Sequence, residues 1–200
     1  MSQFATLARS NLKALFSAAV PALGENLPAE PVGSGFKFRA FGQGCRIGPD
    51  GIFLDHPSSA GVPELLVSIY ALNSRSEAPR LSPFKAFREL PHSGPYVGAF
   101  ASHAEAILVP HVDKIQQQCA HLASQLDGHL EIPAGSADFA FIVRPLPKIA
   151  LNYIFYRADE EFPAAVSCLF SNNAASFLPT DALADVGEVT SRRMVDLLQC

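Results

Sequence analysis

Several things are scarce in this sequence. It contains no tryptophan and only 2 methionines, and charged residues make up 17% of its 200 positions. Soluble proteins usually contain about 25% charged residues. Because 48% of the residues are hydrophobic, the chain has ample material for a core, which excludes disorder of the chain as a whole. The length suits one domain, and we predict a single α+β domain over residues 1–200.

Basic clusters and long apolar runs are also missing. The net charge is −4, and apart from the Arg192-Arg193 pair no Lys/Arg cluster occurs, so a nucleic-acid partner is not expected. No apolar run approaches the roughly 20 residues of a membrane span, so no membrane partner is expected either. Ala14–Leu23 faintly resembles a signal peptide, but it is short and contains Ser17 and Pro21, and it is equally well interpreted as an amphipathic helix. A cytoplasmic location is the expectation.

The usual local motifs of metal and hydrolase chemistry are absent. The four cysteines are far apart and form no CxxC pair, which speaks against an iron–sulfur cluster. Neither HExxH nor a closely spaced histidine pair occurs, so no metal site is predicted. A GxSxG nucleophile motif is missing as well. The cofactor, if there is one, stays unknown, and the interpretation of the protein as an enzyme is left open, with a non-enzyme favoured.

Hydrophobic periodicity predicts the helices. Apolar residues recur at three- and four-residue steps over 3–20, 63–72 and 96–126, which is typical of amphipathic helices. Pro110 predicts a break in the third segment, because proline disrupts helical hydrogen bonding. A closing helix is expected after Thr180, which we interpret as its N-cap.

Alternating and continuous apolar runs predict the strands. Residues 35–41 and 45–47 form an expected hairpin, and the strands of a C-terminal meander are expected at 138–144, 149–156 and 164–170. Short connections between neighbouring strands favour antiparallel pairing. The predicted fold class is therefore α+β: an antiparallel sheet built from an N-terminal hairpin and a C-terminal three-strand meander, with helices packed on one face.

The connector Arg157–Pro163 joins the last two strands and carries the only dense acidic cluster, Asp159, Glu160 and Glu161. Three interpretations are open. The connector is a solvated hairpin tip, it contacts a partner or forms an ion pair with Arg157, or its carboxylates serve a metal or acid–base catalysis. Consecutive carboxylates point in different directions on an extended chain, which favours the solvated tip.

A second candidate region lies between residues 82 and 100. Its aromatic side chains, among them Tyr96 and Phe100, could line an apolar pocket in which Arg88 anchors a polar group. Ordinary core packing is the alternative. The candidate ligand-binding residues are thus Arg88, Tyr96 and Phe100, together with the three carboxylates of the connector.

Two stretches of the sequence resemble a known family. The first is Phe84–Pro91 with Tyr96 and Phe100, and the second runs from Pro147 through the connector to Phe170 and on to Phe177–Leu183. Together they resemble the Domain of Unknown Function 3786 family of anaerobic bacteria and archaea. This resemblance implies no settled activity. Some relatives are joined to an iron–sulfur module, which implies a setting in anaerobic cofactor or one-carbon metabolism, but this chain has no such module.

Three functions follow as hypotheses. The first is an uncharacterised soluble accessory protein of anaerobic metabolism that binds a ligand or cofactor, with a small molecule or a protein as its partner. The second is an enzyme that uses Asp159, Glu160 or Glu161, with or without a metal ion. The third is a structural subunit of a homodimer that pairs through an exposed sheet edge or an apolar helix face.

Overall fold

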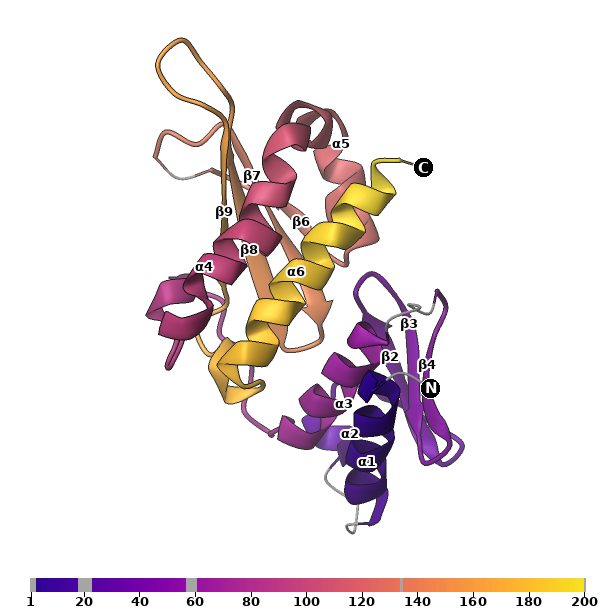
Figure 1. The fold of residues 1–200 in the computed structure, drawn as a ribbon. Helices are drawn as coiled ribbons and strands as arrows, with labels where there is room; N and C mark the ends of the chain where they lie inside the picture. Colours follow the sequence, from indigo (N-terminus) through magenta and orange to yellow (C-terminus); the bar gives the residue numbers. More distant parts are fainter. Residues whose placement is uncertain (1–2, 18–22, 57–60, 134, 200) are drawn as a thin grey trace.

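The computed structural model describes residues 3–17, 23–56, 61–133 and 135–199. The chain has an α+β fold with two antiparallel sheets (Figure 1). This confirms the predicted fold class and the antiparallel pairing. No helix among these residues is long and apolar enough to cross a membrane.

The first sheet has the order β1-β2-β3-β4. Its strands are Glu30–Val32, Gly35–Ala40, Gln43–Gly48 and Gly51–Leu54. The helices α1 (Gln3–Ser17) and α3 (Val62–Asn73) pack against each other beside it, and the short α2 (Leu23–Asn26) precedes it (Figure 1). Residues 18–20, at the end of the first predicted helix, lie outside the described residues.

The hairpin between β2 and β3 turns at two residues with left-handed backbone. Phe41 has φ 52° and Gly42 has φ 75°, as a two-residue hairpin turn that matches strand twist requires. Glycine is needed at position 42, because a Cβ there would lie 2.3 Å from the carbonyl oxygen of Gln125. The turn is therefore close to the C-terminal end of α5 (Val112–Gln125).

The second sheet has the order β5-β9-β8-β7-β6. In chain order, its strands are Lys85–Ala86 (β5), His129–Glu131 (β6), Phe139–Leu146 (β7), Ile149–Tyr156 (β8) and Ala165–Phe170 (β9). The predicted meander forms its centre, and helices cover one face (Figure 1). These are α4 (Val97–Phe100), α5 (Val112–Gln125) and α6 (Thr180–Leu197).

The segment between α4 and α5 is irregular, as the proline predicted. A π-helical turn spans Ala101–Glu105, and a 3-10 segment with Pro110 inside it spans Ala106–His111. By contrast, the N-cap prediction for α6 was wrong. The N-cap residue is Pro179, and the hydroxyl of Thr180 donates to the carbonyl oxygen of Pro91 at 2.6 Å instead.

The N-terminal hairpin and the C-terminal meander lie in separate sheets, whereas the sequence predicted one sheet built from both. They meet where the backbone N–H of Phe41 donates to the carbonyl oxygen of Pro145 at 2.8 Å. Pro145 has no N–H to return, and β7 changes register between Val143 and Leu146. Pairing therefore does not continue from one sheet into the other.

The buried side chains nevertheless form one cluster that includes both sheets. Phe38 and Tyr70 belong to it from the first half of the chain, and Phe141, Tyr153 and Phe177 from the second. The backbone N–H of Lys148 also donates to the hydroxyl of Tyr70 at 3.2 Å across this boundary. One domain over residues 1–200 stays a prediction.

Candidate functional site

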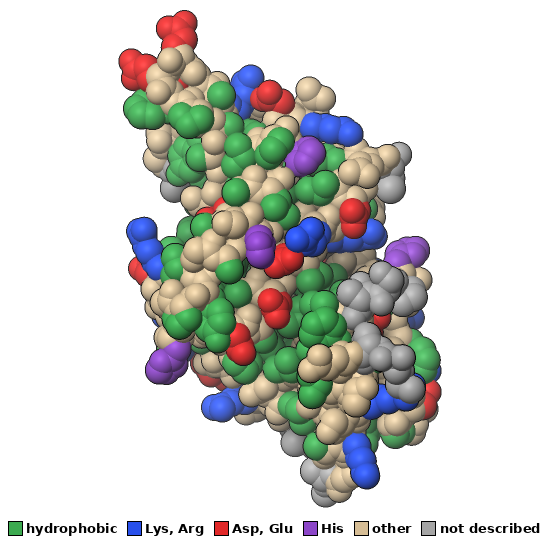
Figure 2. All heavy atoms as spheres, in the orientation of Figure 1, with side chains coloured by type: hydrophobic (Ala, Val, Ile, Leu, Met, Phe, Trp, Pro, Cys, Tyr) green, Lys and Arg blue, Asp and Glu red, His purple; other side chains and the backbone are tan. Residues whose placement is uncertain are grey.

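The acidic connector forms an exposed tip at the end of the β8–β9 hairpin. Figure 2 shows carboxylates at the far end of the molecule, where Figure 1 places this hairpin. A carboxylate oxygen of Asp159 accepts the backbone N–H groups of Glu161 at 2.8 Å and Phe162 at 2.7 Å. These two bonds lower the pKa of Asp159 below its ordinary value. The carboxylate thus serves the turn itself.

Arg157, at the base of this tip, points to other partners. Its guanidinium lies 3.3 Å from Asp113 at the start of α5, and its backbone N–H donates to Asp138 at 2.8 Å. In the described parts of the chain, no hydrogen bond or ion pair joins the three connector carboxylates to Arg88 or to a histidine. Among the same residues, no group of three or more His, Cys, Asp or Glu side chains is close enough together to hold a metal ion.

The aromatic candidates lie at the opposite end of β9. Phe100 is buried and stacks on Phe87 with ring centroids 4.3 Å apart. Tyr96 is exposed, and with Phe100 and His103 it lines a hollow of about 230 Å³ beside α6. Arg88 is exposed and does not line this hollow. The structure therefore brings Tyr96 and Phe100 together, and places Arg88 and the connector elsewhere.

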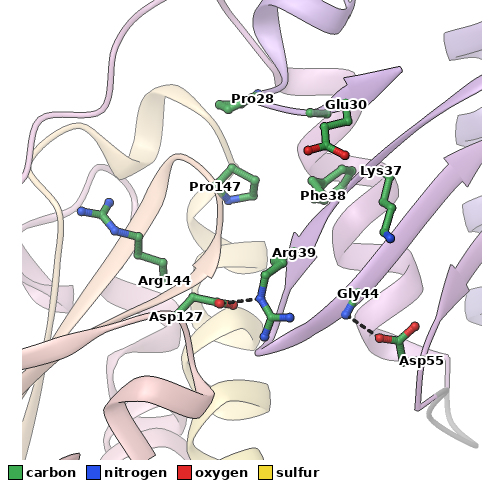
Figure 3. A pocket seen from close by; sticks show the side chains of 11 residues that line it. Pro28, Glu30, Lys37, Phe38, Arg39, Gly44, Asp55, Asp127, Arg144 and Pro147 are labelled. Carbon is green, nitrogen blue, oxygen red and sulfur yellow. Dashed lines mark hydrogen bonds and ion pairs between the residues drawn. The ribbon is translucent and has the colours of Figure 1, made fainter. Parts of the chain in front are cut away.

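Two larger hollows flank the turn between β2 and β3. The first, which we call the charged groove, has a volume of about 780 Å³ and lies between β2, the end of α5 and β7 (Figure 3). Arg39 forms an ion pair with Asp127 across it, and Asp55 accepts the backbone N–H of Gly44 at 2.9 Å. Arg144 points away from this pair in Figure 3. The groove is open and mixed in charge.

Asp127 holds an unusual position in this groove. It has φ 58°, and the N–H of Gly128 beyond it donates to the carbonyl oxygen of Ala123 at 2.8 Å, which ends α5. Glycine is needed at the next position, because a Cβ at position 128 would lie 1.8 Å from the carbonyl oxygen of Ile142. One buried carboxylate oxygen of Asp127 has no partner among the described residues.

The second hollow, which we call the α6 hollow, lies on the other side of the same turn. Its volume is about 660 Å³, within the range of small-molecule sites. It is bounded by α6, the start of α1, the start of α3 and the β2–β3 turn, and its apolar wall consists of Phe4, Phe41, Val62, Pro63, Leu65 and Val189. Figure 2 shows hydrophobic side chains gathered where α6 faces α1 and α3.

Gln43 is the most informative residue of the α6 hollow. It is 8% exposed, and its side-chain oxygen accepts the backbone N–H of His56 at 2.6 Å. The amide nitrogen of Gln43 is not among the buried polar atoms that lack a partner, so solvent or a ligand in the hollow can reach it. Gln43 therefore offers an amide donor to a molecule bound in the hollow.

Arg193 supplies a second donor to the same hollow. Its Nε is buried and has no partner among the described residues. The neighbouring Arg192 is engaged, because its Nε donates to Glu188 at 2.9 Å. The other oxygen of Glu188 lies 3.2 Å from Nδ1 of His103. Of the two adjacent arginines, Arg193 is thus the one that a ligand could use.

The acidic side of the hollow is formed by α6. Partial loss of solvent, and the nearby charges of Glu188 and Asp181, raise the pKa of Asp185 above its ordinary value. The carboxyl groups of Asp185 and Glu188 and the guanidinium groups of Arg192 and Arg193 all belong to the lining, so the charge of the hollow is mixed.

Sequence reasoning missed the α6 hollow. The side chains that form it come from distant segments, and tertiary packing, in which α6 contacts α3, brings them together. One local signal was present. Gln43 occupies an inward position of β3, in alternation with the buried Cys45 and Ile47, and a lone polar residue on an inward strand face points to a special role.

Comparisons with known proteins give one result. A family model described as "Domain of unknown function (DUF3786)" matches residues 20–193. No curated protein and no solved structure matches the chain.

Proposed function

We propose that this chain, which belongs to the family described as "Domain of unknown function (DUF3786)", is an accessory protein that binds a small organic ligand in the α6 hollow. The residues matched by the family model include Gln43 and Arg193, which line this hollow. The observation that carries this proposal is the buried Nε of Arg193, which has no partner among the described residues and lies in the lining of an apolar-walled cavity that Gln43 also lines.

The chemistry of the hollow defines the class of ligand. An unmet buried donor costs roughly 1–3 kcal/mol, so a ligand acceptor that fills the site recovers this free energy. The apolar wall around Phe4, Phe41 and Leu65 suits a flat or branched hydrocarbon body. The ligand is therefore a largely apolar molecule with carbonyl or carboxylate oxygens, and an N–H or O–H group on it can reach Asp185.

Binding is tested with two variants that keep the fold. Gln43→Glu keeps the oxygen that accepts the His56 N–H and replaces only the donor nitrogen by an acceptor. Arg193→Gln removes the second donor. Gln117→Glu, on the exposed side of α5, makes the same chemical change as Gln43→Glu away from the hollow and serves as the matched control.

The measurements are native mass spectrometry of the freshly purified protein and thermal shift with a library of aromatic carboxylates, lactams and neutral heterocycles, with aliphatic amines as the contrast set. We expect oxygen-acceptor compounds to bind the natural chain and Gln117→Glu, and to bind both hollow variants at least tenfold more weakly, since each loses about one hydrogen bond. Equal binding by all four proteins, or no binding by any compound, would refute the proposal.

A further inference from the structure

The outer strand of the second sheet, β6, has an open edge. It pairs only with β7, through His129 opposite Ile142, Leu130 opposite Phe141 and Glu131 opposite Ala140. No other described strand pairs with it on the outer side. An open edge presents unpaired backbone N–H and C=O groups, which makes it a template for another strand.

Apolar side chains are exposed along this edge. Leu130 is 51% exposed, and Ile132, directly after the strand, is 87% exposed. In the order of the sheet, β6 stands at the end opposite to β5. Natural edge strands are usually protected by charge, by proline or by a covering element. Pro133 ends this segment, but Leu130 and Ile132 are left uncovered by the described residues.

The sequence of β6 is complementary to itself. If two copies of the strand align antiparallel about Leu130, Leu130 of one copy faces Leu130 of the other, and His129 faces Glu131 on both sides of the axis. Directly opposite side chains in antiparallel strands lie about 4.5–5.5 Å apart, and pairs of opposite charge stabilise the pairing. One strand thus offers both the apolar centre and the polar pairs that a two-fold axis requires.

We propose that a second copy of this chain docks on β6 and continues the second sheet across a two-fold axis. The dimer joins two sheets edge to edge, and each copy covers Leu130 and Ile132 of the other. This interface is independent of the α6 hollow, because none of the hollow's lining residues belongs to β6. A negative result in the ligand-binding experiment therefore does not bear on the proposed dimer. A monomeric chain, in turn, does not bear on ligand binding in the α6 hollow.

Charge exchange tests the register. In the proposed dimer, Glu131→Lys places lysine opposite His129, and His129→Glu places glutamate opposite Glu131. Because the two-fold axis repeats each pair, either single variant replaces both attractive pairs of the dimer by unfavourable ones. The double variant His129→Glu/Glu131→Lys restores opposite charges at both positions. Sedimentation equilibrium of the full chain measures the dimer dissociation constant in each case.

We expect each single variant to raise the dissociation constant roughly tenfold or more, and the double variant to return it to within about threefold of the natural value. Leu130→Lys should abolish the dimer, whereas Leu72→Lys, at an exposed leucine of α3, should leave it unchanged. Circular dichroism and thermal melting confirm that each variant is folded.

Three results would overturn the proposal. A natural chain that stays monomeric over the accessible concentration range removes the dimer. A double variant that associates no better than the single variants removes this register. Loss of association in Leu72→Lys but not in Leu130→Lys moves the interface to the helical side of the first sheet.

Discussion

The hydroxyl oxygens of Tyr153 and Ser191 lie 2.9 Å apart in the interior and join β8 at the centre of the second sheet to α6. Ser191 donates its hydrogen to the carbonyl oxygen of Ala104 at 2.6 Å, so Tyr153 is the donor in the pair. Burial raises the pKa of Tyr153 well above its ordinary value, which keeps the phenol protonated and able to donate. Sheet, π-helical turn and α6 are thus connected through two hydroxyl groups.

The two hydrogen bonds from Tyr153 to Ser191 and from Ser191 to Ala104, which we call the hydroxyl relay, lead to a prediction about stability. Ser191→Ala removes the nearer acceptor of the buried Tyr153 hydroxyl and leaves only the carbonyl oxygen of Gly187 at 3.5 Å, so it should cost about 1–3 kcal/mol of unfolding free energy. Tyr153→Phe leaves Ser191 bonded to Ala104 and should cost less, about 0.5–1.5 kcal/mol. Urea denaturation measures both. If Ser191→Ala is as stable as the natural chain, the phenol has another partner and the relay is not required.

Gly187 predicts a second stability effect. A Cβ at this position of α6 would lie 2.5 Å from Cε2 of Phe100. In an exposed helix, alanine is favoured over glycine by about 1 kcal/mol, but here the overlap with a buried, stacked ring should reverse the sign and destabilise the fold by about 1–3 kcal/mol.

The measurement is thermal or urea unfolding of Gly187→Ala, alone and combined with Phe100→Leu. The smaller leucine leaves room for the methyl group, so Gly187→Ala should cost less in the Phe100→Leu background than in the natural one. An identical cost in both backgrounds would show that Phe100 is not the residue that excludes a side chain at position 187.

Glu105 predicts a dependence on pH. Burial raises its pKa above the ordinary value, and its hydrogen bond from the backbone N–H of Cys168, at 2.9 Å, offsets only part of this effect. A carboxyl group with a raised pKa in the folded state contributes stability that is fully present below the unfolded pKa and is lost as the pH rises through the folded pKa. The natural chain should therefore lose this contribution on going from acid to neutral pH.

Glu105→Gln removes the titration and keeps an oxygen for the Cys168 N–H. Relative to the natural chain, this variant should be more stable at pH 7, and the difference should shrink as the pH falls below the ordinary glutamate value. Urea unfolding across pH 4–7 gives the comparison, and Glu161→Gln on the exposed connector is the control. A constant difference across this range would contradict the burial argument.

Periodicity predicted most of the elements because each has enough residues to show its pattern. The meander from β7 to β9 and the amphipathic α6 were both visible in the sequence. The strands β1 (Glu30–Val32) and β5 (Lys85–Ala86) were not, since two or three residues cannot establish an alternation. The division into two sheets also could not be predicted, because which strands pair is decided by tertiary packing and not by the alternation within each strand.

The residues of the α6 hollow could not be predicted from the sequence for a different reason. Gln43 and Arg193 lie at opposite ends of the chain, and neither belongs to a motif, so only tertiary packing reveals that they line one hollow. The acidic connector, by contrast, is conspicuous in the sequence and forms a turn that bonds to itself through Asp159. Local composition identified a distinctive segment, whereas the unmet donor of Arg193 is a property of burial and could be found only in three dimensions.

The shared core has a consequence for how this protein can vary. Phe38 and Tyr70 from the first half of the chain and Phe141 and Tyr153 from the second belong to one buried cluster, so separation would expose aromatic surface on both halves. We expect neither half to be exchanged between proteins as an independent module. The α6 hollow, which both halves border, is therefore expected to change by substitution within one chain rather than by shuffling of its parts.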